Sequence, residues 1–139
     1  MAMLLTDKQY KLALLSIERS KKREEELKEK YKNDKKALKQ MLEMESISLI
    51  PQIKDEVKEY ENIKAGKFPA YMKKLENIGY LLIALRIHKG WSQSELAKKL
   101  NIKPSQVCRN ERNEYYGVSM PTVRKMLKVF DCNINMEIS

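Results

Sequence analysis

The sequence predicts a mainly α-helical protein, with an antiparallel, coiled-coil-like helical hairpin in residues 1–66 and a second domain in residues 67–139. Apolar residues recur at helical spacing through the first region, where charged residues fill the other positions. Capping motifs and isolated Gly and Pro residues divide the second region into several short helices. The final stretch, residues 133–138, alternates polar and apolar side chains, which predicts a short C-terminal strand.

The hairpin is predicted from its cap and its bend. Thr6-Asp7-Lys8-Gln9 is a capping box that opens a first helix, and Asn33-Asp34 marks the bend before a second helical pattern. Pro51 interrupts this pattern and should kink it or shift the start of its helix. Because each helix has only a narrow apolar stripe, the hairpin alone would be marginally stable. We therefore expect its stripe to pack against a second copy of the chain, or onto the C-terminal domain of the same chain.

The domain boundary coincides with a change in charge. Gly66 and Pro69 end the second helical pattern. Residues 1–64 contain 15 Lys/Arg and 13 Asp/Glu, whereas residues 65–139 contain 13 Lys/Arg and only 6 Asp/Glu. The net charge of +9 is thus concentrated in the C-terminal domain. This balance favours a polyanionic partner, either nucleic acid or an acidic membrane surface.

The composition disfavours several functional classes. Two cysteines and one histidine are too few for a zinc finger, and they define no disulfide framework. No paired catalytic constellation and no phosphate-binding loop is present, so we expect no enzyme, no catalytic residue, no cofactor and no metal. A membrane role fits poorly, because the basic half has no wide apolar face and no apolar run is long enough to span a bilayer.

A dense set of helix signals lies between residues 92 and 113. Ser92-Gln93-Ser94-Glu95 is a second capping box and opens a short helix. Asn101 follows this helix, where a sharp turn needs a residue that tolerates a left-handed φ. Pro104 suits the first turn of the next helix, because its missing N–H would be unpaired there. Two short helices joined by such a turn form a helix-turn-helix unit. Its inward residues are apolar: Leu96, Ala97, Leu100, Ile102 and Val107.

Two further helices complete a core of residues 78–131. One starts at about Tyr71 or Leu75 and ends at Lys89, before Gly90. The other follows Ser119, which is placed to cap it. The helix-turn-helix unit therefore lies between two helices that can cover its apolar side.

The segment from Arg86 to Val107, RIHKGWSQSELAKKLNIKPSQV, resembles the XRE family of lambda-repressor/Cro-like regulators. The shared pattern is a basic first helix, Gly, Ser-Gln, Glu-Leu-Ala, Leu, a turn residue and an apolar pair that flanks the recognition helix. The resemblance covers residues 78–131 and implies a lambda-repressor-like domain that binds double-stranded DNA. Residues 60–116 also resemble a bacterial and phage subset that carries a helical hairpin before this module, some of whose members are antitoxin-like.

The resemblance implies roles for individual residues. Gln93 would hold a phosphate of the DNA backbone, and Arg86 would pair with Glu111 in a structural salt bridge. Positions in the first turn of the recognition helix, and one position a turn later, would touch base edges in the major groove. These positions are Pro104, Ser105, Gln106 and Arg109, of which Pro104 has no side-chain donor.

The chemistry of these side chains supports DNA reading independently of the family. Arg can make two hydrogen bonds to guanine and Gln can make two to adenine, so we expect Ser105, Gln106 and Arg109 to contact bases. Neighbouring polar and basic side chains would contact the DNA backbone and set the register. The expected backbone contacts are Gln93, Ser94, Lys98, Lys103, Asn113, Tyr115 and Tyr116. The two tyrosines could equally pack the loop before Ser119.

These observations predict a cytoplasmic, nucleoid-associated transcriptional regulator. We expect a homodimer that represses a promoter by binding a roughly palindromic operator, with half-sites about 34–36 Å apart or a multiple of that distance. The alternative is an antitoxin-type protein whose N-terminal hairpin binds a toxin or another regulator as its protein partner. The two hypotheses are compatible, because the hairpin and the DNA-binding module occupy different parts of the chain.

Overall fold

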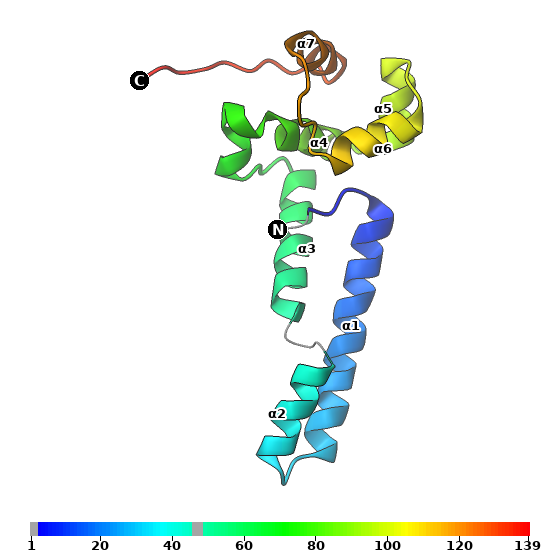
Figure 1. The fold of residues 1–139 in the computed structure, drawn as a ribbon, viewed down its shortest axis with the longest axis vertical. Helices are drawn as coiled ribbons and strands as arrows, with labels where there is room; N and C mark the ends of the chain where they lie inside the picture. Colours follow the sequence, from blue (N-terminus) through cyan, green and yellow to red (C-terminus); the bar gives the residue numbers. More distant parts are fainter. Residues whose placement is uncertain (1–2, 46–48) are drawn as a thin grey trace. The chain divides into compact units, whose positions relative to one another are not determined.

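A computed structural model describes residues 3–45 and 49–139 of the chain. The chain divides into two compact units, Met1–Tyr60 and Glu61–Ser139, and all regular elements in the described ranges are helical (Figure 1). The expected boundary at residue 66 lies within the second unit. No helix in these ranges combines the length and the apolarity that a membrane crossing needs.

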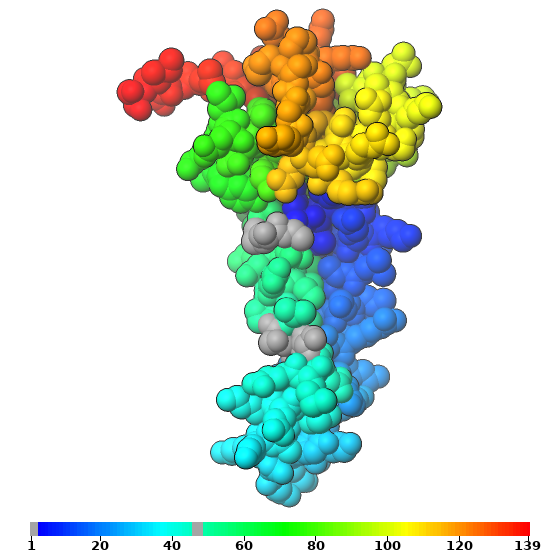
Figure 2. Space-filling model, viewed as in Figure 1, coloured from blue at the N-terminus to red at the C-terminus, as the bar shows by residue number. Residues whose placement is uncertain are grey.

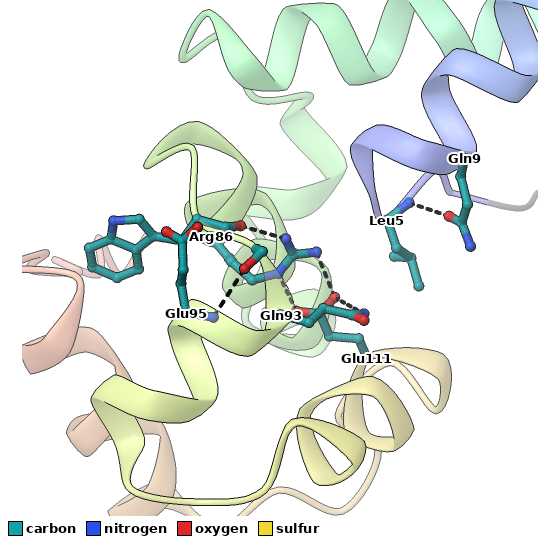
Figure 3. A network of polar contacts seen from close by, with 8 residues as sticks. Leu5, Gln9, Arg86, Gln93, Glu95 and Glu111 are labelled. Atoms are coloured by element: carbon teal, nitrogen blue, oxygen red, sulfur yellow. Dashed lines mark hydrogen bonds and ion pairs between the residues drawn. The ribbon is translucent and has the colours of Figure 1, made fainter.

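The first unit contains α1 (Asp7–Lys30), α2 (Lys35–Met44) and most of α3 (Ile50–Lys64). Thr6 caps α1 by accepting a hydrogen bond from the Gln9 backbone N–H, and the Gln9 side chain accepts one from Leu5 N at 2.8 Å (Figure 3). The capping box therefore works as predicted, except that the glutamine reaches one residue further back. Pro51 lies in the first turn of α3, where a residue without an N–H is tolerated.

The helices of the first unit form a hairpin in which α1 runs antiparallel to α2 and α3 (Figure 1). Asp34 caps α2 after the bend, as the Asn33-Asp34 signal indicated. Tyr10 on α1 stacks on Tyr60 of α3, with ring centroids 4.8 Å apart, and Leu27 is fully buried. Contacts at both ends of α1 therefore hold the hairpin closed.

The second unit begins with the last residues of α3 and two short 3₁₀ turns, η2 (Ala70–Lys73) and η3 (Leu75–Asn77). Four helices follow: α4 (Ile78–His88), α5 (Gln93–Leu100), α6 (Pro104–Arg112) and α7 (Met120–Val129). Ser92 caps α5 and Ser119 caps α7, each by accepting from the N–H three residues later. The fully or nearly fully buried side chains come from all four helices and their flanks: Ile63, Met72, Leu82, Ile83, Leu96, Val107, Val123, Met126 and Phe130.

The expected C-terminal strand is wrong: no strand occurs in residues 3–45 or 49–139, and residues 132–139 have no regular structure. Figure 1 draws this segment as an extended trace after α7. Ile134, Met136 and Ile138 are 39%, 68% and 92% exposed. Alternation of side chains predicts two faces, but a strand also needs a neighbouring strand to satisfy its backbone groups. The second unit offers only helices.

A close approach of two backbone segments fixes the start of α4. Gly79 is buried, and a Cβ atom at this position would lie 1.9 Å from the backbone oxygen of Glu114, in the turn after α6. The same Cβ would lie 3.3 Å from Cβ of Tyr115. Only a glycine allows α4 and this turn to meet.

Replacing Gly79 with Ala should therefore destabilise the second unit by about 1–3 kcal/mol or more. In an ordinary helix position the same change stabilises by roughly 0.5–1 kcal/mol. Denaturant unfolding followed by the fluorescence of Trp91 measures this, because Trp91 is the only tryptophan of the chain. Ser94→Ala, at an exposed position of α5, is the control and should stay within about 0.5 kcal/mol of the unmodified chain. A Gly79→Ala protein as stable as that control would contradict the close approach.

Candidate nucleic-acid interface

The turn between α5 and α6 has the geometry expected of a helix-turn-helix. Asn101 adopts a left-handed conformation, with φ 58° and ψ 44°. Ile102 N donates to Ala97 O at 3.0 Å, and Asn101 N donates to Lys98 O at 3.2 Å. These bonds satisfy the last carbonyl groups of α5 while the chain reverses. Ala97 and Val107 are completely buried where the two helices cross.

Helix α6 separates its buried side chains from its exposed ones. Its buried residues are Val107 and Glu111, one turn apart and on one face. Pro104 occupies the first helical turn, as predicted. The three expected base-contacting residues, Ser105, Gln106 and Arg109, are all exposed. In the space-filling view the yellow segment that contains α6 lies at the surface (Figure 2).

A buried ion pair connects α4 with α6 (Figure 3). Arg86 Nε donates to Glu111 Oε2 at 2.6 Å, and Arg86 Nη2 donates to Glu111 Oε1 at 2.7 Å. The side chains are 3% and 0% exposed. The third guanidinium nitrogen, Nη1, donates to the carbonyl of Trp91 at 2.8 Å, in the turn before α5. The structure thus contains the pair that the family resemblance implied, and this pair also holds the intervening turn.

The same carboxylate reaches the first residue of α5. Gln93 Nε2 donates to Glu111 Oε1 at 3.0 Å, so one buried glutamate has hydrogen bonds from both α4 and α5. Among the described residues, every buried side-chain nitrogen and oxygen has a hydrogen-bond partner. A buried charge pair stabilises a fold only when its hydrogen bonds are satisfied in this way.

The residues expected to contact the DNA backbone lie at the surface near α5 and α6, with one exception. Ser94, Lys98, Lys103 and Asn113 are exposed, and Gln93 is half-buried. The side chain of Tyr116 is 94% exposed. These positions place polar and basic groups before α6, after α6 and along α5.

The exception is Tyr115, which was expected either at the DNA backbone or in the loop before Ser119. Its side chain is only 6% exposed, because the left-handed backbone at this residue, with φ 53°, turns it into the domain. Burial raises the pKa of its hydroxyl, and the nearby charge of Glu111 adds to this effect. Tyr115 therefore packs the loop before Ser119, which was the other role open to it.

From the sequence, no DNA contact was expected of Arg112. This residue follows Arg109 by three positions and is exposed on the same helix. Its Nη2 lies 3.6 Å from the sulfur of Cys108. The helical spacing of the two arginines was the signal that could have found it. Arg112 adds a second guanidinium to the exposed side of α6.

A second group of contacts joins the turn before α5 and both ends of α5 to the C-terminal part of the second unit. The Trp91 ring stacks on Phe130, with centroids 5.6 Å apart, and Lys99 lies over the Trp91 ring at 4.5 Å. Lys125 donates to the carbonyl of Leu100 at 3.1 Å, at the C-terminal end of α5. Lys99 and Lys125 therefore have structural contacts within the second unit.

In the described part of the chain, no group of three or more His, Cys, Asp or Glu side chains could hold a metal ion. Cys108 and Cys132 are free thiols.

The geometry described above defines a helix-turn-helix domain with an exposed, basic second helix. Residues 82–135 match the family model of the helix-turn-helix domain HTH_3. The chain has no significant match among curated proteins or among solved structures. Residues 82–135 therefore form an XRE-type helix-turn-helix domain, which supports a role in DNA binding.

Loss of the charge on Glu111 should destabilise the domain strongly. Glu111→Gln keeps the shape of the side chain but leaves the buried Arg86 cation without a counter-charge, which should cost about 3–5 kcal/mol. Denaturant unfolding followed by Trp91 fluorescence measures the loss. Glu95→Gln removes the same charge at an exposed position of α5 and should change stability by less than about 0.5 kcal/mol. Equal effects of the two substitutions would show that the pair does not hold the fold.

Proposed function

We propose that the chain is a sequence-specific transcriptional regulator that inserts α6 into the major groove of duplex DNA. The observation that carries this proposal is the division of α6 into a buried side and an exposed side. Val107 and Glu111 anchor the helix in the domain, whereas Ser105, Gln106 and Arg109 are exposed. Side chains that read base edges must be free of the core and fixed by a rigid helix.

The exposed residues of α6 suit different bases. The guanidinium of Arg109 can donate two hydrogen bonds to O6 and N7 of guanine, and the amide of Gln106 can pair with N6 and N7 of adenine. Ser105 can donate or accept, so it discriminates less. Each good bidentate contact separates the right base from the wrong one by roughly 1–3 kcal/mol.

Contacts to the DNA backbone would set the position of α6 in the groove. Phosphate contacts fix register and orientation but carry no direct sequence information. The structure leaves suitable polar, basic or aromatic side chains exposed or half-buried near both ends of α6. The proposed set is Gln93, Ser94, Lys98, Lys103, Asn113 and Tyr116.

We further propose that the regulator acts as a homodimer in the cytoplasm, associated with the nucleoid. Two copies would place two α6 helices on a roughly palindromic operator, with half-sites about 34–36 Å apart or a multiple of that distance. Bound across a promoter, such a dimer represses transcription by occlusion. The outer face of α1 supports self-association, because Leu12 and Leu15 are 57% and 40% exposed and lie one turn apart.

A second candidate function is the binding of a protein partner, such as a toxin, by the first unit. This function is favoured by a groove that Leu38, Leu42, Ile50 and Pro51 line, with charged residues at its rim. Partner binding by this unit is compatible with DNA binding by the second.

Arg109→Ala should relax the preference at one base position in each half-site, because it removes a bidentate donor. Selection of bound duplexes from random DNA, with the unmodified chain and with the variant, measures the change. Arg19→Ala removes the same charge from an exposed position of α1 and should leave the selected sequence unchanged. An unchanged selected sequence for Arg109→Ala would contradict its role in base reading.

Light scattering of the full chain should give twice the chain mass of 16.4 kDa. The double substitution Leu12→Glu and Leu15→Glu should return the mass to that of one chain, because it places charges on the proposed apolar contact. Lys11→Glu, at a neighbouring exposed position, is the control and should remain dimeric. A double variant with an unchanged mass would rule out dimerisation through α1.

A further inference from the structure

A basic cluster lies at the tip of the helical hairpin, where α1 ends and α2 begins. This hairpin tip, residues 28–39, contains six lysines and only two acidic residues. The rest of the first unit, residues 1–27 and 40–60, contains eight basic and ten acidic residues. The positive charge of this unit is therefore concentrated at one end of the hairpin (Figure 1). All six lysines are exposed: Lys28, Lys30, Lys32, Lys35, Lys36 and Lys39.

The two acidic residues of the hairpin tip are engaged elsewhere and do not pair with the lysines of α2. Glu29 forms an ion pair with Lys32 at 3.4 Å. Asp34 caps α2, where its carboxylate accepts a backbone N–H at 3.1 Å. Within residues 3–45 and 49–139, no ion pair involves the three lysines of this helix: Lys35, Lys36 and Lys39.

Two of these lysines occupy an electrostatically unfavourable part of α2. Lys35 and Lys36 are the first two residues of the helix, and its first turn contains no acidic residue. The N-terminus of a helix carries a partial positive charge, so acidic side chains stabilise it and lysines do not. A local preference that a sequence breaks without a structural gain is expected at functional sites. An anion at the hairpin tip would offset the lysine charges and the helix dipole together.

The chemistry of the hairpin tip favours the phosphate backbone of duplex DNA as this anion. Lysine is a compact point charge, and a phosphate contact carries no sequence information. An acidic membrane surface would require a wide apolar face, whereas the apolar side chains of the tip, Tyr31, Ala37 and Leu38, are half-buried. The second unit carries a helix-turn-helix domain. Because the two units belong to one chain, a duplex bound by this domain is present at a high effective concentration for the tip.

We propose that the hairpin tip is a second, sequence-independent DNA contact, which binds backbone phosphates that flank the operator. The inference rests on the proposed function, since the second unit must hold a duplex for the tip to reach one. Helix α1 has 24 residues and is therefore about 36 Å long, which equals about ten base pairs of duplex. A hairpin of this length gives its tip the reach to contact phosphates outside a half-site.

Binding of the full chain to duplexes of two lengths tests the proposal. The short duplex contains only an operator selected from random DNA, and the long one adds about 20 base pairs of arbitrary sequence on each side, more than the length of α1. Each phosphate that a lysine neutralises adds about 0.9 to the slope of log affinity against log salt. The tip variant combines three substitutions: Lys35→Gln, Lys36→Gln and Lys39→Gln.

On the long duplex, the unmodified chain should depend more steeply on salt than the tip variant. With three phosphate contacts per chain, it should lose about 40-fold more affinity than the variant between about 50 and 200 mM salt. On the short duplex, which has no flanking phosphates, the two proteins should show the same salt dependence.

A matched variant removes the same number of charges from exposed positions of the first unit outside the tip: Lys11→Gln, Lys22→Gln and Lys58→Gln. It should keep the salt dependence of the unmodified chain on both duplexes. Thermal unfolding followed by circular dichroism provides a second control. The tip variant should unfold at no lower a temperature than the unmodified chain, because it removes cations from the positive end of α2. Unfolding at a lower temperature would show that these lysines stabilise the hairpin, and would overturn the inference.

The remaining outcomes separate this inference from the proposed function. If the tip variant and the unmodified chain show the same salt dependence on the long duplex, the tip contact is overturned, while binding of the short duplex still supports the proposed function. An acidic protein as the partner of the tip would give that result. Equal losses in the two triple variants would reveal a general effect of net charge and would also overturn the tip contact. If neither duplex binds the unmodified chain, the proposed function itself fails, and the tip contact fails with it.

Discussion

The buried pair of Arg86 and Glu111 is the interaction on which the rest of the second unit depends. It joins α4 to α6, and the third nitrogen of the guanidinium holds the turn that leads into α5. Its two charges lie within 2.6 Å of each other and are almost completely removed from water. Loss of one partner from such a pair leaves an uncompensated buried charge, so the pair favours the arrangement of the three helices in which all of its hydrogen bonds are made. The orientation of α6, and with it the direction in which Ser105, Gln106 and Arg109 face, follows from that arrangement.

Local sequence signals were sufficient to predict most of the helices. Ser92, Asn101 and Pro104 act through neighbours a few residues away, so their roles could be predicted from sequence. The exposure of Ser105, Gln106 and Arg109 followed from the same helical spacing once Val107 was recognised as the inward residue. The family resemblance then supplied the Arg86–Glu111 pair, which local patterns cannot reveal.

The features that sequence reasoning missed depend on contacts between distant segments. The sequence left Tyr115 open between a DNA contact and packing of its loop, and the structure buries it where the turn after α6 packs against Gly79 at the start of α4. Alternation in residues 133–138 suggested a strand, but side-chain pattern says nothing about a pairing partner. The bond between Gln93 and Glu111 likewise joins two helices whose crossing had to be known first.

The way in which α6 is anchored bears on how such a regulator can evolve. Its buried residues are Val107 and Glu111, and the groups that face outward take no part in the core. Substitutions on that outward side can therefore accumulate without threatening the fold, as long as the anchors persist. Under the proposed function, a lineage carrying this scaffold acquires new operators by exchanging a handful of side chains on a single helix, with the remaining architecture inherited intact.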